Sequence, residues 1–266
     1  MARFRFDWVD AFCDRAFGGN GCAVVHDGAA LSAETCTAFV RETSLVECTF
    51  TGPSDVADVR VRYFLASHEI PFAGHPTIAT VAALKARGIV KGERITIATG
   101  AGVVPVTIAD GTIEMTQAAP AFGPEVDPSV VARAIRLPPD EIVGVPQFVS
   151  TGLPFVVTVL RDHGALRGAQ LDSERLRDIA EHATGAFEGS MAEPFLVTLK
   201  GATPEGDTFS RLLLPPPNPP EDPFTGSATG AMAAYLWSRG LMDKPVFIAE
   251  QGHWMGRPGQ ARVTRV

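Results

Sequence analysis

The sequence predicts an α+β protein made of two similar halves, each a curled β-sheet around a buried helix. The first observation is a repeat: "PFAGHPTIATVAALKARG" (71–88) returns as "PFTGSATGAMAAYLWSRG" (223–240), with nine of eighteen positions identical. The second is that both copies read as a glycine turn followed by a helix that is apolar or small on nearly every face. Such a helix must be enclosed. The third is that many short strand patterns and few helices fill the rest of the chain.

The elements of the first half follow from local patterns. Charged and aromatic residues alternate from Arg3 to Trp8, which predicts a strand. Ser32 is a suitable N-cap for a helix reaching about Glu42. The pair Asp110-Gly111 is a strong hairpin signal between two strands. The other predicted strands of this half are "CAVV", residues 59–65 and "RITIAT".

The second half begins after a stretch without periodicity, "QAAPAFGPEVDP" (117–128), which we interpret as a linker. Helices are predicted near 129–137 and 172–183, and strands at "FVVTVL", "FLVTL" and "FSRLLL". The predicted domains are residues 1–118 and 119–266, with the last strand free to cross back to the first half.

The two turns suggest how the halves could serve one function. Pro76 fits the first position of its helix, which makes His75 the expected N-cap, and Ser227 is the expected N-cap of the second copy. A helix start offers unpaired N–H groups and about half a positive charge. Two starts facing one cleft would bind a small anion without lysine or arginine.

Composition excludes several classes of function. The chain has 266 residues and a net charge of −7, which speaks against binding to nucleic acid or to an anionic membrane. It contains no apolar run of about 20 residues and no signal-peptide pattern. The four cysteines are scattered, which predicts reduced thiols and a cytoplasmic location.

Three motifs that resemble catalytic signatures fail on inspection. "HEIPFAGH" is not a metal-binding HExxH, because Pro71 interrupts the helix that this motif requires. "TGSATG" lacks the glycine spacing of a serine hydrolase, and "GAGVVP" lacks the third glycine of a dinucleotide site. Acid–base chemistry without metal or cofactor remains as the natural interpretation.

Two acidic residues and one histidine are the candidates for that chemistry. Glu47 lies among apolar neighbours, where a carboxyl would have a raised pKa suited to proton transfer; the alternative, which the segment alone favours, is a surface glutamate pointing away from a strand. Asp222 directly precedes the second turn. His75 is either a simple N-cap or a hydrogen-bond partner of a substrate carboxylate.

These residues carry a resemblance that covers nearly the whole chain. "PFAGHPT", with Arg62 and Glu69 before it, and "EDPFTGSATG" (221–230) are similar to the phenazine-biosynthesis PhzF-like family. Matches also occur at "FGGN", around Glu47, at "STGLPF" (150–155) and at "EQG...GRPG" (250–259).

The resemblance implies a diaminopimelate-epimerase-like fold and a cofactor-independent isomerase or epimerase, commonly a homodimer, acting on a small carboxylate-bearing metabolite. It assigns proton transfer to Glu47, with Asp222 and His75 assisting. The substrate-binding residues that it implies are Asn20, Gly74, His75, Gly226 and Ser227.

The chain departs from the family pattern at two places. Gly21 follows Asn20 where the family has proline, and Val46 and Cys48 flank Glu47 where the family has hydroxyl residues. Both departures bear on the phenazine substrate more than on proton transfer itself. Two alternatives to the isomerase stay open: a protein of this fold that binds a small acid without turnover, and an amino-acid racemase or epimerase.

Overall fold

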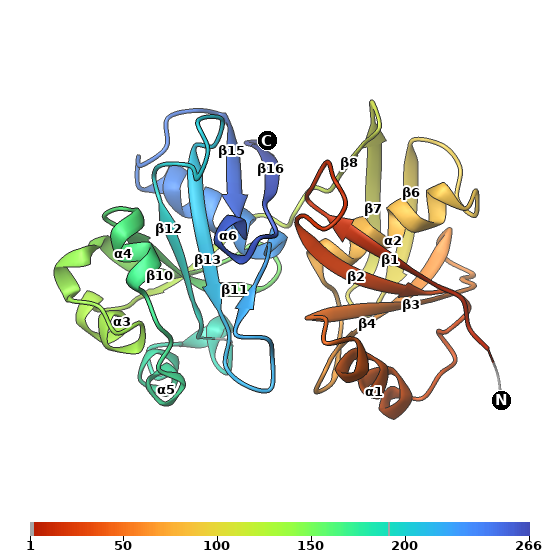
Figure 1. Cartoon of the computed structure of the whole chain (residues 1–266), viewed down its shortest axis with the longest axis horizontal. Helices are drawn as coiled ribbons and strands as arrows, with labels where there is room; N and C mark the ends of the chain where they lie inside the picture. The colour runs from red at the N-terminus through yellow and green to blue at the C-terminus, as the bar shows by residue number, and fades with distance from the viewer. Residues whose placement is uncertain (1–2, 191) are drawn as a thin grey trace. The chain divides into compact units, whose positions relative to one another are not determined.

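The computed structural model describes residues 3–190 and 192–266 (Figure 1). The chain divides into two units, one formed by the residues up to Thr116 with Pro217–Pro219, the other by Gln117–Pro216 with Pro220–Val266. The division falls near the predicted boundary after residue 118.

The first unit is an eight-stranded mixed sheet curled around one helix (Figure 1). Its strands run in the order β1-β2-β3-β4-β6-β7-β8, with β5 beside β4; β2–β3 and β4–β6 are parallel pairs. The elements are β1 (Phe6–Ala11), β2 (Asn20–Val25), α1 (Ala33–Thr43), β3 (Glu47–Gly52), β4 (Val59–Leu65), β5 (Glu69–Ile70), α2 (Gly74–Ala86), β6 (Arg94–Thr99), β7 (Gly102–Ala109) and β8 (Thr112–Glu114).

The second unit repeats this order. Its eight strands run β9-β10-β11-β12-β13-β15-β16, with β14 beside β13 and parallel pairs at β11–β12 and β13–β15. The strands are β9 (Ala121–Glu125), β10 (Ile142–Ser150), β11 (Pro154–Leu160), β12 (Pro194–Thr198), β13 (Thr208–Leu213), β14 (Glu221–Asp222), β15 (Val246–Gln251) and β16 (Gly259–Thr264). The helices are α3 (Pro128–Ala134), α4 (His163–Gly168), α5 (Leu176–Ala180) and α6 (Gly226–Ser238).

Each strand from β1 to β7 therefore has a counterpart in the second unit, from β10 to β16, and α2 corresponds to α6. The extra strand sits beyond β7 in the first sheet, as β8, and beyond β10 in the second, as β9. The repeat seen in the sequence is thus one part of a duplication that covers the whole sheet.

The central helices are held by packing rather than by helix propensity. Val81 and Leu84 of α2 are fully buried, and each such side chain stabilises the fold by about 1.5–3 kcal/mol relative to exposure. The β-branched residues of α2 disfavour a helix by only a few tenths of a kcal/mol each, at most about 0.7. Helix α1 covers the other face of the first sheet, and Ser32 caps it as predicted, accepting from Thr35 N.

Three predictions about elements need correction. Residues 121–125 of the predicted linker form β9, which pairs with β10 through backbone contacts that its sequence does not signal. The helix predicted at 172–183 is a short 3₁₀ turn followed by α5. Strand β16 pairs with β15 in register from Val246–Thr264 to Gln251–Gly259, so it stays in the second sheet rather than crossing back.

In each unit an arginine–glutamate ion pair joins the short strand before the central helix to the neighbouring strand of the sheet. Arg62 donates to both carboxylate oxygens of Glu69, at 2.8 and 2.6 Å, and Arg211 does the same with Glu221, at 3.0 and 2.7 Å. Each arginine also donates to two backbone carbonyls of the layer outside the sheet. The short strands β5 and β14 thereby lead into the glycine turns in the same way.

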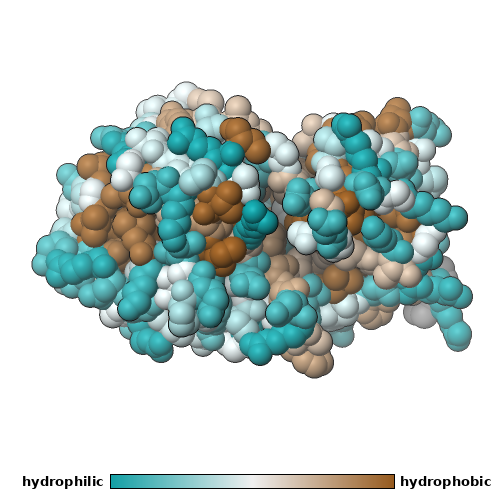
Figure 2. Space-filling model, turned by 90° about the horizontal axis from the view of Figure 1, so that it is seen from above, coloured by the Kyte–Doolittle hydropathy of each residue, from teal (hydrophilic) through white to brown (hydrophobic). Residues whose placement is uncertain are grey.

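The surface carries scattered apolar groups. On the face shown in Figure 2, hydrophilic residues predominate and the hydrophobic ones form separate patches among them. Such scattering is ordinary for a folded protein. None of the helices described is long and apolar enough to cross a membrane.

Candidate active site

The first turn places His75 inside α2 rather than at its cap. Helix α2 begins at Gly74 and its N-cap is Ala73, so the prediction that His75 is the N-cap and Pro76 the first helical residue is wrong. Ala73 is extended, with φ −148° and ψ 145°, and its carbonyl already accepts from Thr77 Oγ1 at 2.7 Å. The helix therefore begins two residues before Pro76.

The second turn has the same geometry. Helix α6 begins at Gly226 with Thr225 as N-cap, and Ser227 is its second residue, not its cap. Thr229 Oγ1 donates to the Thr225 carbonyl at 2.9 Å, as Thr77 does to Ala73. Neither N-cap side chain accepts from the first-turn N–H groups. Both helix starts therefore offer backbone donors and positive potential to an anion.

Three of the predicted site residues meet in the first unit. Glu47 is the first residue of β3, Asn20 is the first residue of β2, and His75 lies in the first turn of α2. Glu47 Oε2 lies 3.2 Å from His75 Nδ1, and Asn20 Nδ2 lies 3.2 Å from the same nitrogen. The side chains of Glu47 and His75 are 13% and 4% exposed, so Glu47 is no surface glutamate.

Burial decides the charge of this histidine. It lowers the pKa of His75 to about 3, against an opposing backbone hydrogen bond with Gly21. The ring is therefore neutral near pH 7. A neutral Nδ1 can donate to the Glu47 carboxylate or accept from Asn20, but not both at once. His75 Nε2 is buried and has no hydrogen-bond partner among the described residues.

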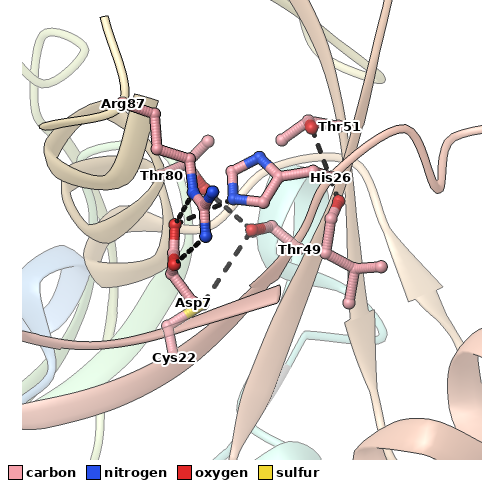
Figure 3. A network of polar contacts seen from close by, with 8 residues as sticks. Asp7, Cys22, His26, Thr49, Thr51, Thr80 and Arg87 are labelled. Atoms are coloured by element: carbon pink, nitrogen blue, oxygen red, sulfur yellow. Dashed lines mark hydrogen bonds and ion pairs between the residues drawn. The ribbon is translucent and has the colours of Figure 1, made fainter. Parts of the chain in front are cut away.

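Polar contacts hold α2 in register against β3, which carries Glu47, and against the neighbouring β4. Thr49 and Thr80 are bonded through their hydroxyls at 2.8 Å, and Tyr63 and Thr77 at 2.7 Å. Figure 3 shows Thr49 between Thr80 of the helix and Cys22 of β2. A buried hydroxyl left unpaired costs about 1–3 kcal/mol, so a shift of α2 along β3 is unfavourable.

The far end of α2 is held by charge. Arg87, the C-cap residue of α2, binds both carboxylate oxygens of Asp7 at 2.5 Å, and His26 Nε2 contacts the same carboxylate at 2.9 Å (Figure 3). Arg87 holds the pKa of Asp7 down at about 2. Asp7 is therefore ionised at neutral pH, and Arg87 links the helix to β1 at the end opposite His75.

The second unit holds a different polar cluster. Thr225 Oγ1 donates to Asp222 Oδ2 at 2.5 Å, and the Gln251 amide accepts from Thr225 N at 3.0 Å and donates to the Asp222 carbonyl at 2.7 Å. All three side chains are buried. This network fixes the backbone that leads into Gly226 and Ser227.

A second glutamine, Gln117, stabilises the start of α6 through hydrogen bonds. Gln117 Nε2 donates to the Gly226 carbonyl at 2.8 Å, and Gln117 Oε1 accepts from Thr151 Oγ1 at 2.5 Å. A Cβ at Gly230 would lie 1.9 Å from Gln117 Oε1, so glycine there makes room for this side chain. The corresponding residue of the first copy is Ile78.

Sequence reasoning did not single out Gln117, Gln251 or Thr225. Gln251 lies within the "EQG" match and Gln117 begins the predicted linker, so each was available as a polar residue next to a matched motif. Their partners lie tens of residues away, at 222–226, and no local pattern predicts such pairing.

Other potential sites are of a different kind. Among residues 3–190 and 192–266, no group of three or more His, Cys, Asp or Glu is placed to hold a metal ion. A surface hollow of about 380 Å³ in the first unit is lined by residues that include Arg60, Arg62 and Glu69. Neither Glu47 nor His75 lines it, so this hollow is not the candidate site.

Comparison with known proteins gives one consistent result. The family model described as phenazine biosynthesis-like protein matches residues 9–266. An uncharacterized isomerase of Bacillus subtilis is 30% identical over 96% of this chain and 88% of its own length. The trans-2,3-dihydro-3-hydroxyanthranilate isomerase of Pseudomonas aeruginosa is 30% identical over 87% of this chain and 79% of its own.

A solved structure supports the fold directly. A predicted epimerase from Pseudomonas aeruginosa superposes with a TM-score of 0.82 and 28% identity, covering 98% of this chain and 92% of its own. The predicted two-unit α+β fold is confirmed, and so is the prediction of an enzyme of the isomerase class. The chain belongs to the phenazine biosynthesis-like protein family.

Proposed function

We propose that this protein is a cofactor-independent isomerase that moves a proton on a small carboxylate-bearing metabolite, with Glu47 as the base. The observation that carries the proposal is the buried contact of Glu47 with a neutral His75. A carboxylate next to a neutral imidazole can take up and release a proton without a compensating fixed charge.

In the proposed reaction Glu47 removes a proton from a substrate carbon, and the electron pair moves into the conjugated system of the substrate. Before the transfer, His75 Nδ1–H donates to the carboxylate. Afterwards the same N–H donates to the carbonyl oxygen of the protonated Glu47, so His75 keeps its proton on Nδ1 throughout. Glu47 then delivers its proton to another carbon, or to the other face of the same carbon.

Substrate binding is assigned to the first turn. The N–H groups at Gly74–His75 bind the substrate carboxylate, and the uncapped start of α2 supplies the positive potential. Asn20, whose amide nitrogen lies 3.2 Å from His75 Nδ1, makes a further contact to the substrate. The substrate contacts of Asp222, Gly226 and Ser227 in the second unit stay predictions.

The first compound to test is trans-2,3-dihydro-3-hydroxyanthranilate, because a relative at 30% identity is named for its isomerisation. The glycine at 21 and the residues that flank Glu47 depart from the family pattern, so close analogues and chiral amino acids complete the panel. Epimerisation would appear as a change of optical rotation and allylic isomerisation as a shifted double bond.

Proton transfer is tested by exchange in heavy water, followed by NMR. Wild-type protein should place deuterium on a substrate carbon, and Glu47→Gln should reduce the exchange rate by about 10²–10⁴-fold. Glu42→Gln, an exposed glutamate of α1, is the matched control and should exchange like wild type. Full exchange by the Glu47 variant would remove this residue as the base. Tight binding without exchange across the panel would show a binding protein instead.

A further inference from the structure

Strand β1 forms one edge of the first sheet. Among the strands that the structure describes, it pairs only with β2. The Arg5 carbonyl, just before β1, accepts from His26 N at 2.9 Å and so points toward β2. In an antiparallel pair, successive residues direct their N–H and C=O groups to opposite sides. The backbone groups of Phe6 and Trp8 therefore point away from β2, toward an edge that no described strand occupies.

The second unit has a strand on the equivalent edge, and two arginines identify the matching residues. Arg87 binds Asp7 of β1, and Arg239, its counterpart in the repeat, donates to the Gln147 side chain of β10 at 2.8 Å. Gln147 is therefore the counterpart of Asp7. Glu125 of β9 lies opposite Gln147 and also contacts Arg239, at 2.5 Å. The added strand β9 thus supplies the carboxylate that Asp7 supplies within the first unit.

The backbone at this edge has the same direction in both units. Pro146 precedes Gln147 as Phe6 precedes Asp7, so Pro146 is the counterpart of Phe6. The Pro146 carbonyl accepts from Val126 N, next to β9, at 2.8 Å. The Phe6 carbonyl points to the same side of its own sheet. The fold therefore accepts an antiparallel strand at the position that β1 leaves open.

The side chains along this edge form a row of exposed aromatic rings. Phe4, Phe6 and Trp8 are 41%, 49% and 52% exposed. Alternate residues of a strand share a face, and the Phe6 ring meets Phe39 of α1 edge-on at 5.7 Å between centroids. The row therefore lies on the α1 face of the sheet. Large apolar groups that gather at one exposed place mark an interaction surface.

We propose that β1 of a second copy of this chain pairs antiparallel with β1, so that the two first sheets become one continuous sheet. Outward-pointing backbone groups meet only if even-numbered residues oppose even-numbered residues. Placing Phe6 opposite Phe6 also places Phe4 opposite Trp8 and Arg5 opposite Asp7. Registers shifted by one such step oppose either the two Arg5 or the two Asp7 side chains, and like charges directly opposite are destabilising. Charge complementarity therefore selects the register centred on Phe6.

Sedimentation velocity over a concentration series tests the dimer. Wild type should reach twice the chain mass of 28.2 kDa. Phe6→Pro removes an N–H that points outward and leaves the bonds between β1 and β2 intact, and proline already stands at the counterpart position 146. Both copies lose this hydrogen bond, so the Kd of the dimer should rise at least about 30-fold. Phe6→Tyr keeps the ring and the N–H and should dimerise like wild type.

Cysteine cross-linking tests the register. Phe6→Cys places two thiols on directly opposite residues, whose Cα atoms lie about 5.5 Å apart, and mild oxidation should produce a covalent dimer. Trp8→Cys is the matched control on the same face. Its two copies are offset by about 14 Å along the strands, so it should form no covalent dimer above the wild-type background. A mixture of Phe4→Cys and Trp8→Cys should cross-link one variant to the other.

Three results would overturn the inference. Wild-type protein that stays monomeric at every concentration would show that this edge does not bind a second copy, even if it binds another protein. A dimer that Phe6→Pro leaves intact would have its interface elsewhere. Covalent dimers of Trp8→Cys without those of Phe6→Cys would exclude the register. Circular dichroism checks that Phe6→Pro is folded, and if it is not, the cysteine variants decide alone.

Discussion

The two arginine–glutamate pairs allow the strength of an ion pair to be tested twice in one molecule. The perturbation is Glu→Gln at position 221 and, separately, at position 69. Each substitution keeps the side-chain size, removes the negative charge and replaces one acceptor oxygen by an NH₂ group that faces the guanidinium. The arginine keeps its two backbone carbonyl contacts in both cases.

The expected losses differ because solvent reaches the two carboxylates unequally. The side chains of Arg211 and Glu221 are 14% and 12% exposed, whereas Glu69 is 39% exposed beside an equally buried Arg62. Breaking a buried pair costs about 3–5 kcal/mol, and an exposed pair contributes about 0–1 kcal/mol. We therefore expect about 3 kcal/mol for Glu221→Gln, near the low end of the buried range, and about 1 kcal/mol for Glu69→Gln.

Native-state hydrogen exchange is the suitable assay, because it gives an opening free energy for each segment. The amides of β13 should lose about 2 kcal/mol more protection in Glu221→Gln than those of β4 lose in Glu69→Gln, roughly a 30-fold difference in exchange rate. Glu205→Gln, an exposed residue of the second unit, controls for the loss of charge. Equal losses, or a larger loss at position 69, would refute the argument from solvent exposure.

Two further predictions concern the candidate site. Folding lowers the pKa of His75 from 6.5 to about 3. Between these pH values the unfolded chain therefore binds one proton more than the folded chain. The free energy of unfolding should then fall on acidification by up to about 1.4 kcal/mol per pH unit. Urea unfolding at pH 7 and pH 5 should show a smaller drop for His75→Asn, and an unchanged drop would disprove the burial of a neutral ring. Thr225→Val removes the hydroxyl that donates to Asp222, so we expect KM for the substrate to rise more than kcat falls. Thr225→Ser should restore both, and failure of the serine variant would point to the lost methyl group instead.

The features that the sequence predicted well depend on local chemistry. Ser32 caps α1 because a hydroxyl next to a helix start finds a nearby N–H whatever the tertiary context. Asp110 and Gly111 form the hairpin turn with φ of 49° and 79°, as that pair of residues favours. The proximity of Glu47 and His75 was implied by family resemblance, and it follows physically from the curling of β3 around α2.

The features that escaped prediction depend on distant partners. Strand β9 has no alternating pattern, and its pairing with β10 is decided by backbone hydrogen bonds. The start of α2 was placed two residues late, because the preference of proline for the first helical position is weaker than the bond from Thr77 to Ala73. The role of Gln251 needs a residue 29 positions away, and no single-chain pattern supplies that information.

The matched strand order gives the residues of β1 to β7 and of α2 a structural counterpart in the second unit. Positions at which the two copies have the same residue, such as Gly74 and Gly226, indicate which residues the fold requires there. Positions at which they diverge, such as His75 and Ser227, are the ones that the architecture tolerates changing. A residue can therefore be transferred from one unit to its counterpart position in the other as a protein-engineering experiment, because the two positions share the same backbone arrangement.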